Sequence, residues 1–148
     1  MKWKKALATL DEADIWTRPN AASNSIGNLV LHLCGNITQY ILSALGGDAD
    51  DRQRDAEFAA QQGATKAILF QNLATTIAVA KTVIAAMDDD ELAAVKMIQG
   101  KPFSGIANIL HVVEHFSYHT GQVIFWTKSL KNQDMEFYAN WAVNAKNA

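Results

Sequence analysis

The sequence predicts an all-α fold, a four-helix bundle, and three observations lead to that prediction. The 148 residues include only two prolines, Pro19 and Pro102, and each stands ahead of a long segment with the apolar periodicity of a helix. Proline is tolerated at the start of a helix but not in its interior, so the uninterrupted segments favour helices. Alternating β-branched residues over the length of a strand are missing throughout. A chain of this length is expected to fold as a single domain over residues 1–148.

The expected helices can be placed in order along the chain. They cover residues 2–15, 23–45, 64–87 and 103–130. Ser23 or Asn24 is the expected N-cap of the second helix, and Gly46 with Gly47 is its expected end. The acidic residues 88–91 after the third helix are expected to begin a short extra turn.

A charged segment, residues 46–63, joins the second and third expected helices. One interpretation is a solvated crossover, since runs of charge usually face water. The other is that Arg52 or Arg54, together with Asp55 or Glu57, folds back over the bundle and shapes a pocket. The sequence leaves both interpretations open.

The four histidines are the most informative residues of the chain. His32 stands alone in the second expected helix, whereas His111, His115 and His119 form a ladder in the fourth with steps of four residues. Such a step rotates by about 40° and rises by about 6 Å, so the ladder lies on one helix face. Two imidazoles of the ladder and a third from the neighbouring helix would form a metal site with an open coordination position.

These helices also carry uncharged polar stripes. No Lys, Arg, Asp or Glu occurs between Ser23 and Gly47, although an exposed helix of this length usually carries several. Two explanations compete for the stripes: a shared polar cavity, in which buried polar groups need partners, and a subunit interface. A membrane span is not expected, because Asn28, Asn36 and Gln39 make the second segment too polar for a single lipid-facing helix.

Composition excludes several classes of function. A net charge of −2 with both signs scattered excludes the basic surface of a nucleic-acid binder. A single cysteine, Cys34, excludes an intrachain disulfide framework and indicates the cytoplasm, in keeping with the lack of a signal-peptide pattern. Cys34 lies about 200° around the helix from His32, so a Cys/His dyad is not expected. No G-x-S-x-G motif occurs that would indicate a serine nucleophile.

Three segments carry a resemblance to a known family. NSIGNLVLHLCGN (24–36), RQRDAEF (52–58) and ILHVVEHFSYHTGQV (109–123) resemble the DinB/YfiT-like superfamily of four-helix-bundle metalloproteins, and the likeness extends over about residues 10–130. It implies an up-down-down-up bundle with a long crossover between helices 2 and 3, and frequent dimers. Matched residue by residue, it implies that His32, His115 and His119 hold a divalent metal. The first helix is shorter here, so a partner chain is a candidate to complete the bundle.

The resemblance and the histidine pattern together lead to a hypothesis about function. It is a metal-dependent transferase or hydrolase that acts on a small molecule, using a low-molecular-weight thiol or a water activated by the ion. Zinc is the first choice, with nickel and iron as alternatives, because imidazole suits all three. The residues expected around the pocket or behind the ligands are Asn28, Asn36, His111 and Gln122. Glu114 is a further candidate base, although its position on the helix equally favours solvent.

Two other functional interpretations and one expectation about assembly accompany this hypothesis. The chain is alternatively a non-catalytic, stress-related metal-binding bundle, or a metal-free bundle in which Asn28, Asn36 and Gln122 satisfy the histidines. The uncharged helix faces and the short first helix predict a homodimer.

Overall fold

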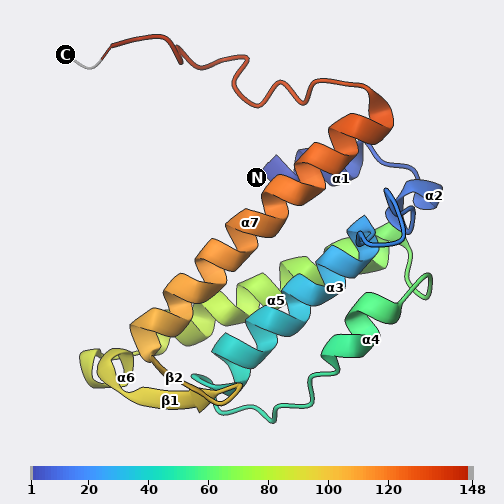
Figure 1. Ribbon diagram of the computed structural model, residues 1–148. Coiled ribbons are helices and arrows are strands. Elements are labelled where there is room, and N and C mark those ends of the chain that lie inside the picture. The colour runs from blue at the N-terminus through green and yellow to red at the C-terminus, as the bar shows by residue number, and fades with distance from the viewer. Residues whose placement is uncertain (1, 147–148) are drawn as a thin grey trace.

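The computed structural model describes residues 2–146, and helices dominate it (Figure 1). Three helices are long: α3 (Ile26–Ile37), extended by the π-helical segment η1 (Thr38–Ser43), α5 (Lys66–Ala86) and α7 (Gly105–Lys131). The shorter elements are α1 (Lys2–Ala8), α2 (Glu12–Ile15), α4 (Arg54–Ala59), α6 (Asp89–Ala93), and the strands β1 (Val95–Ile98) and β2 (Lys101–Ser104). The prediction of an all-α helical bundle is confirmed.

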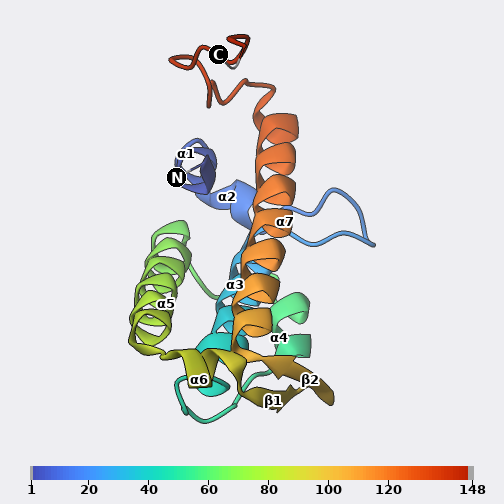
Figure 2. The same ribbon diagram turned by 90° about the vertical axis from the view of Figure 1, so that its left-hand side faces the viewer.

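Helix α3 occupies the centre of the bundle. It packs against α5, α4 and α7, and Figure 2 shows α5 and α4 on opposite sides of it. Ile26, Val30, Leu33, Ile37 and Ile41 form its apolar face and are buried. The buried apolar side chains of α3, α1 and α5 form one continuous core. Among the described helices, α5 alone is long and apolar enough to cross a membrane, by length and composition only.

The prediction of one first helix over residues 2–15 is wrong, because the chain breaks it into α1 and α2. Asp11 ends the break and starts α2, where its backbone N–H donates to the Asp14 carboxylate at 2.7 Å. Acidic side chains at a helix start satisfy free N–H groups in this way. Trp3 and Leu7 of α1 are buried, and α1 packs against the C-terminal half of α7 (Figure 1). The first helix therefore covers only one end of the bundle.

The start of the central helix also differs from the expectation. The N-cap is Ser25, not Ser23 or Asn24, and its hydroxyl accepts from the Asn28 backbone N–H at 3.1 Å. The helix ends before Gly46 and Gly47, as expected, after widening into the π-helical segment η1. Gly47 has a φ of 85°, the left-handed conformation that glycine adopts readily where a helix ends.

A β-hairpin precedes α7, where the sequence predicted no strands. Strands β1 and β2 pair antiparallel, with Met97 opposite Pro102, so this proline lies in a strand and not at the mouth of the helix. Gln99 and Gly100 form the turn with positive φ angles, 50° and 76°, as in the two-residue turns that suit hairpins. α7 begins after Ser104, whose hydroxyl accepts from the Ala107 N–H at 3.2 Å.

Candidate metal centre

Three histidines from two antiparallel helices meet in the middle of the bundle. His32 comes from α3, and His115 and His119 come from consecutive turns of α7; we call them the histidine triad. One ring nitrogen of each lies within 4.8 Å of the others, a separation at which one ion could be held. The Nε2 atoms of His32 and His115 are 2.8 Å apart. His32 and His119 are buried, and His115 is half-buried.

The outer nitrogens of two triad members have hydrogen-bond partners that orient the rings. His32 Nδ1 lies 2.8 Å from Glu57 Oε2, and His119 Nδ1 lies 2.7 Å from Gln122 Oε1. Both partners are acceptors, so each Nδ1 donates its proton outward, and in a neutral imidazole the Nε2 atom then keeps its lone pair. Metal-binding histidines are typically oriented by such an acceptor behind the ring.

The charged crossover supplies the carboxylate behind His32. Arg52 holds Glu57 with Nε 2.8 Å from Oε1 and a terminal guanidinium nitrogen 3.0 Å from Oε2, and it also donates to Gln39 Oε1 at 2.9 Å. Both side chains are buried, with exposed fractions of 5% and 10%. The same guanidinium also lies 3.1 Å from His32 Nδ1, but the shorter contact with the carboxylate assigns the Nδ1 proton to Glu57. The interpretation of a purely solvated crossover is therefore wrong for Arg52 and Glu57, although Arg54 and Asp55 are exposed.

Two features of α3 make room for this ion pair and hold it in place. A Cβ atom at Gly35 would collide with Glu57 Oε1 and lie 3.0 Å from Arg52 Nε, so the ion pair packs directly on the backbone of α3. Asn28 donates to the backbone oxygens of Glu57 at 2.9 Å and of Ala60 at 2.7 Å. Asn28 was expected around the pocket. Behind the ligands was the other expected place, and Asn28 anchors the backbone of α4, the helix that carries Glu57, while among the described contacts it makes none with the triad itself.

A second cluster of polar side chains lies one helical turn before the triad along α7. His111 stacks on Tyr40 with ring centroids 4.2 Å apart, and its Nε2 lies 3.4 Å from Asn36 Nδ2. Gln99, from the hairpin turn, accepts from the Tyr40 hydroxyl at 3.3 Å and donates to Gln39 at 2.7 Å. His111 thus lies beside the triad without joining it. Tyr40 and Gln99 give no signal in the sequence, since their proximity depends on the unpredicted hairpin.

Burial and neighbouring groups set the protonation of the site. Burial lowers the pKa of His115 to about 4, with further contributions from His119, His32, His111 and Arg52. Burial also lowers the pKa of His119 and of His111. Burial alone would raise the pKa of Glu57, but hydrogen bonds from His32 and Arg52 outweigh it and hold this pKa below its ordinary value. At neutral pH the centre thus combines a carboxylate with the neutral imidazoles of His115 and His119, whose nitrogens are free to bind a cation.

Two other candidates of the sequence lie away from the triad. Glu114 is exposed on α7, in agreement with its solvent-facing alternative. Cys34 is half-buried near Thr76 of α5, and burial raises the pKa of its thiol to about 11. A thiol with so high a pKa is a poor nucleophile at neutral pH.

Comparison with known proteins identifies the family. A family model described as "Protein of unknown function (DUF1572)" matches residues 1–140. The chain belongs to this family. No curated protein sequence matches the chain.

Solved structures show the same fold. A conserved protein from Enterococcus faecalis superposes with a TM-score of 0.71 at 17% identity, covering 89% of this chain and 90% of that one. A DinB-like protein from Bacillus subtilis gives 0.68 at 16% identity, covering 93% and 88%, and one from Bacillus cereus gives 0.70 at 14%, covering 88% and 84%. The resemblance to DinB-like proteins is confirmed at the level of the fold: the fold of this DUF1572 chain is DinB-like.

Proposed function

We propose that this DUF1572 chain is a divalent-metal-dependent enzyme in which the histidine triad holds the ion and leaves one coordination position open. The observation that carries the proposal is the orientation of the rings. The Nε2 atoms of His32 and His115 face each other, and a ring nitrogen of His119 lies within 4.8 Å of the ligand atoms of both. The Nδ1 atoms of His32 and His119 point outward, toward Glu57 and Gln122. Without an ion, the 2.8 Å approach of two imidazole nitrogens would have to be satisfied by a single shared proton.

The donor set supports activation of a small ligand at the open position. Among residues 2–146 no fourth His, Cys, Asp or Glu joins the triad as a ligand. Three neutral imidazoles leave the full charge on the ion, which lowers the pKa of a bound thiol or water and makes a nucleophile at neutral pH. The proposed reaction is transfer or hydrolysis of a small-molecule substrate, with a low-molecular-weight thiol or water as nucleophile. Zinc is the proposed metal, and nickel and iron suit the same ligands.

Metal analysis is the first experiment. Protein produced without a histidine tag should retain close to one equivalent of zinc, nickel or iron after dialysis, as measured by elemental mass spectrometry. Alanine substitution of His115 should remove the metal. The same substitution at His111, which neighbours the triad without joining it, is the matched control and should retain the metal. A chain that takes up no divalent metal at neutral pH would contradict the proposal.

A spectroscopic experiment separates an enzyme from a non-catalytic metal protein. In the cobalt-substituted protein, a small thiol should add a thiolate-to-metal charge-transfer band, because the open position accepts an exogenous ligand. The alternative function, a metal that only stabilises the bundle, has support in the triad joining α3 to α7, and it predicts no turnover, whether or not the thiol band appears. Turnover with small electrophiles and thiols would then identify the reaction.

We also propose that the chain forms a cytoplasmic homodimer through α7. Ile106, Leu110 and Val113 are each more than half exposed, and Ser117 and Gly121 continue this uncharged face. Gly121 costs helix stability of about 1 kcal/mol relative to alanine. A Cβ at this position would meet nothing within 4 Å in the described part of the chain, residues 2–146. Small residues on an exposed apolar face allow a second helix to approach closely, and a second copy of the same uncharged face is self-complementary.

Light scattering tests this assembly. The chain should be a dimer at micromolar concentration, and Val113→Glu should shift it to the monomer by burying a charge in the interface. Val95→Glu makes the same change at an equally exposed position of β1, outside this face, and should remain dimeric. A monomeric parent chain would refute the proposal.

A further inference from the structure

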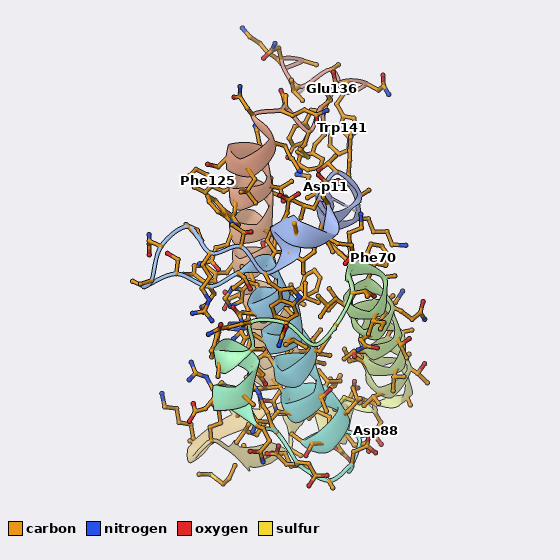
Figure 3. The ribbon with its side chains drawn as sticks, turned by 90° about the vertical axis from the view of Figure 1, so that its right-hand side faces the viewer. Asp11, Phe70, Asp88, Phe125, Glu136 and Trp141 are labelled. Carbon is orange, nitrogen blue, oxygen red and sulfur yellow. The ribbon has the colours of Figure 1, made fainter. Side chains whose placement is uncertain are left out.

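A cleft of about 460 Å³ lies next to the histidine triad, one turn further along both helices. Its floor is formed by Leu29 of α3, one turn before His32, and by Gln122, Phe125 and Trp126 of α7, which follow His119. The loop between α2 and α3 forms its wall through Pro19, Asn20, Ala22, Ser23 and Asn24. Figure 3 shows Phe125 projecting from α7 on the side of this loop. The volume is in the range of small-molecule sites.

Gln122 connects the cleft to the triad directly. Its side chain lines the cleft, and its Oε1 is the atom 2.7 Å from His119 Nδ1. The cleft wall is also attached to the metal centre, because Arg18 donates to the Phe58 backbone oxygen at 2.6 Å. Phe58 stacks on the His32 ring with centroids 4.6 Å apart. A molecule in the cleft would thus lie against Gln122, which orients His119, and against the loop that follows Arg18, the residue joined to the ring stacked on His32.

The chemistry of the lining selects a neutral ligand. Among the residues that the structure describes, no Lys, Arg, Asp, Glu or His lines the cleft. Burying a charge against such a surface is costly, because no opposite charge compensates the lost hydration. Phe125 is 74% exposed, and an exposed large aromatic ring beside a cleft gains free energy when an apolar group covers it. Asn24 and Gln122 provide amide groups at the edge for hydrogen bonds.

Existing hydrogen bonds fix the shape of the cleft. Asn20 Oδ1 accepts from the Ala22 N–H and the Ser23 hydroxyl, both at 3.0 Å, which sets the turn of the loop. The Trp126 indole N–H donates to the Thr17 backbone oxygen at 3.2 Å, which holds this ring against the loop. These bonds give a preformed wall, so binding does not first have to order the loop.

We propose that this cleft binds the uncharged aryl or similar apolar part of a small ligand whose donor group reaches the ion at the triad. The inference rests on the proposed function for the role of the donor group, whereas the cleft itself can be tested without metal. It assigns the substrate class as neutral molecules that combine an apolar ring with a soft or acidic donor. Specificity for the ring then comes from Leu29, Phe125 and Trp126.

Two hydroxamic acids that differ by a phenyl ring test the proposal. Acetohydroxamic acid offers a metal-binding group alone, and benzohydroxamic acid adds the ring. With the zinc-loaded chain, calorimetry should give a Kd for benzohydroxamic acid lower by about tenfold or more, as expected for burial of an aryl group. Equal dissociation constants would overturn the proposal.

A matched pair of loop variants locates the ring. Ala22→Trp fills the cleft from an exposed position and should abolish the difference between the two hydroxamic acids. Ala21→Trp makes the same change at the neighbouring exposed residue, which does not line the cleft, and should preserve the difference. If both variants preserve the difference, the ring lies elsewhere and the proposal is wrong.

A readout independent of metal distinguishes failure of the cleft from failure of the metal site. The indole N–H resonance of Trp126, assigned with Trp126→Phe, should shift when benzohydroxamic acid is added to the metal-free chain, and should not shift with acetohydroxamic acid. This result supports the cleft even if the triad proves to bind no ion. A resonance that benzohydroxamic acid leaves unchanged in the metal-free and the zinc-loaded chain overturns the cleft proposal, whatever the triad binds.

Discussion

The hydrogen bond between Glu57 and His32 leads to a quantitative prediction about metal affinity. Replacing Glu57 with Gln keeps an oxygen near His32 Nδ1 at the observed 2.8 Å but removes the negative charge. A charged hydrogen bond contributes about 1.5–3 kcal/mol and a neutral one about 0.5–1.5 kcal/mol. The difference, about 1–1.5 kcal/mol, should weaken metal binding by about tenfold. Glu57→Ala removes the acceptor altogether and should weaken it by up to about 100-fold.

The assay is a zinc titration in competition with a chromophoric chelator at neutral pH. Asp55→Asn is the matched control, because it removes the same charge from the same helix α4 at an exposed position. It should leave the affinity within about twofold, since an exposed charge is strongly screened by solvent and salt. Circular dichroism of each variant verifies that the bundle is retained.

Two results would refute this reasoning. If Glu57→Gln binds zinc as tightly as the parent chain, the carboxylate does not act through His32. If Asp55→Asn lowers the zinc affinity as much as Glu57→Gln, the loss arises from the long-range electrostatic effect of removing a negative charge and not from loss of the hydrogen bond to His32. Arg52→Gln offers a further check, because it leaves the Glu57 carboxylate but removes the partner that fixes it at 2.8 Å and 3.0 Å. Its effect on affinity should be smaller than that of Glu57→Ala.

Three further predictions concern the same centre. Alanine substitution of any member of the histidine triad should abolish metal binding in a zinc titration, because a two-ligand site loses most of its affinity, whereas His111→Ala should retain the metal. If His111→Ala releases the metal and substitution of His119 does not, the two ligands from α7 are His111 and His115. Gly35→Ala should displace Glu57 and weaken zinc binding by about tenfold, while Gly121→Ala, where a Cβ meets nothing in the chain, should not. In the metal-free chain, the pKa of His115 near 4 lies below its unfolded value of about 6.5, so the unfolded state binds more protons between these values. The stability that neutral His115 contributes is complete above about pH 6.5 and is lost as the pH falls toward 4. The urea midpoint of unfolding should therefore drop over this pH range. A midpoint independent of pH would contradict the lowered pKa of His115.

The long helices could be predicted from sequence because burial leaves a strong periodic signal. The expected ranges 64–87 and 103–130 agree with α5 and α7 to within about two residues at each end, a normal uncertainty for helix termini. The missing charge between Ser23 and Gly47 likewise corresponds to the buried polar side chains of α3, Asn28, His32 and Asn36. Both signals arise from a helix face that is buried away from water. Such a face leaves a pattern of residue types that can be recognised in the sequence alone.

The hairpin and the break in the first helix gave no comparable signal. Val95 and Met97 of β1 are about two thirds exposed, so the strand buries no face that would impose alternation on its sequence. The first helix breaks after Ala8, where Leu10 is buried and Asp11 starts α2, an arrangement that depends on packing against the rest of the bundle. Short elements without an apolar face of their own are fixed by tertiary contacts, which local patterns do not record.

The charged crossover was ambiguous for a different reason. Its contacts with His32 join residues 20 and 25 positions apart, and charge runs on most proteins face solvent. One local signal could have favoured the correct interpretation. Gly35 stands in mid-helix three residues after His32, at a cost in helix stability of about 1 kcal/mol relative to alanine. Such a cost is typical of a site where another group must approach the backbone closely, as Glu57 and Arg52 do.

The ion pair of the crossover also explains how the buried Glu57 carboxylate can orient a ligand of this centre without reducing the charge of an ion held there. Glu57 bound directly to an ion would neutralise part of the ion's charge and reduce its effect on a bound thiol or water. Behind His32, the carboxylate instead orients the imidazole, and Arg52 balances its charge at a distance of 2.8 Å. With the ion pair neutral overall and His115 and His119 favoured in their neutral forms, the centre adds no net charge of its own. An ion held there would keep its full charge for the ligand at the open position, which is the property that activation of a nucleophile requires.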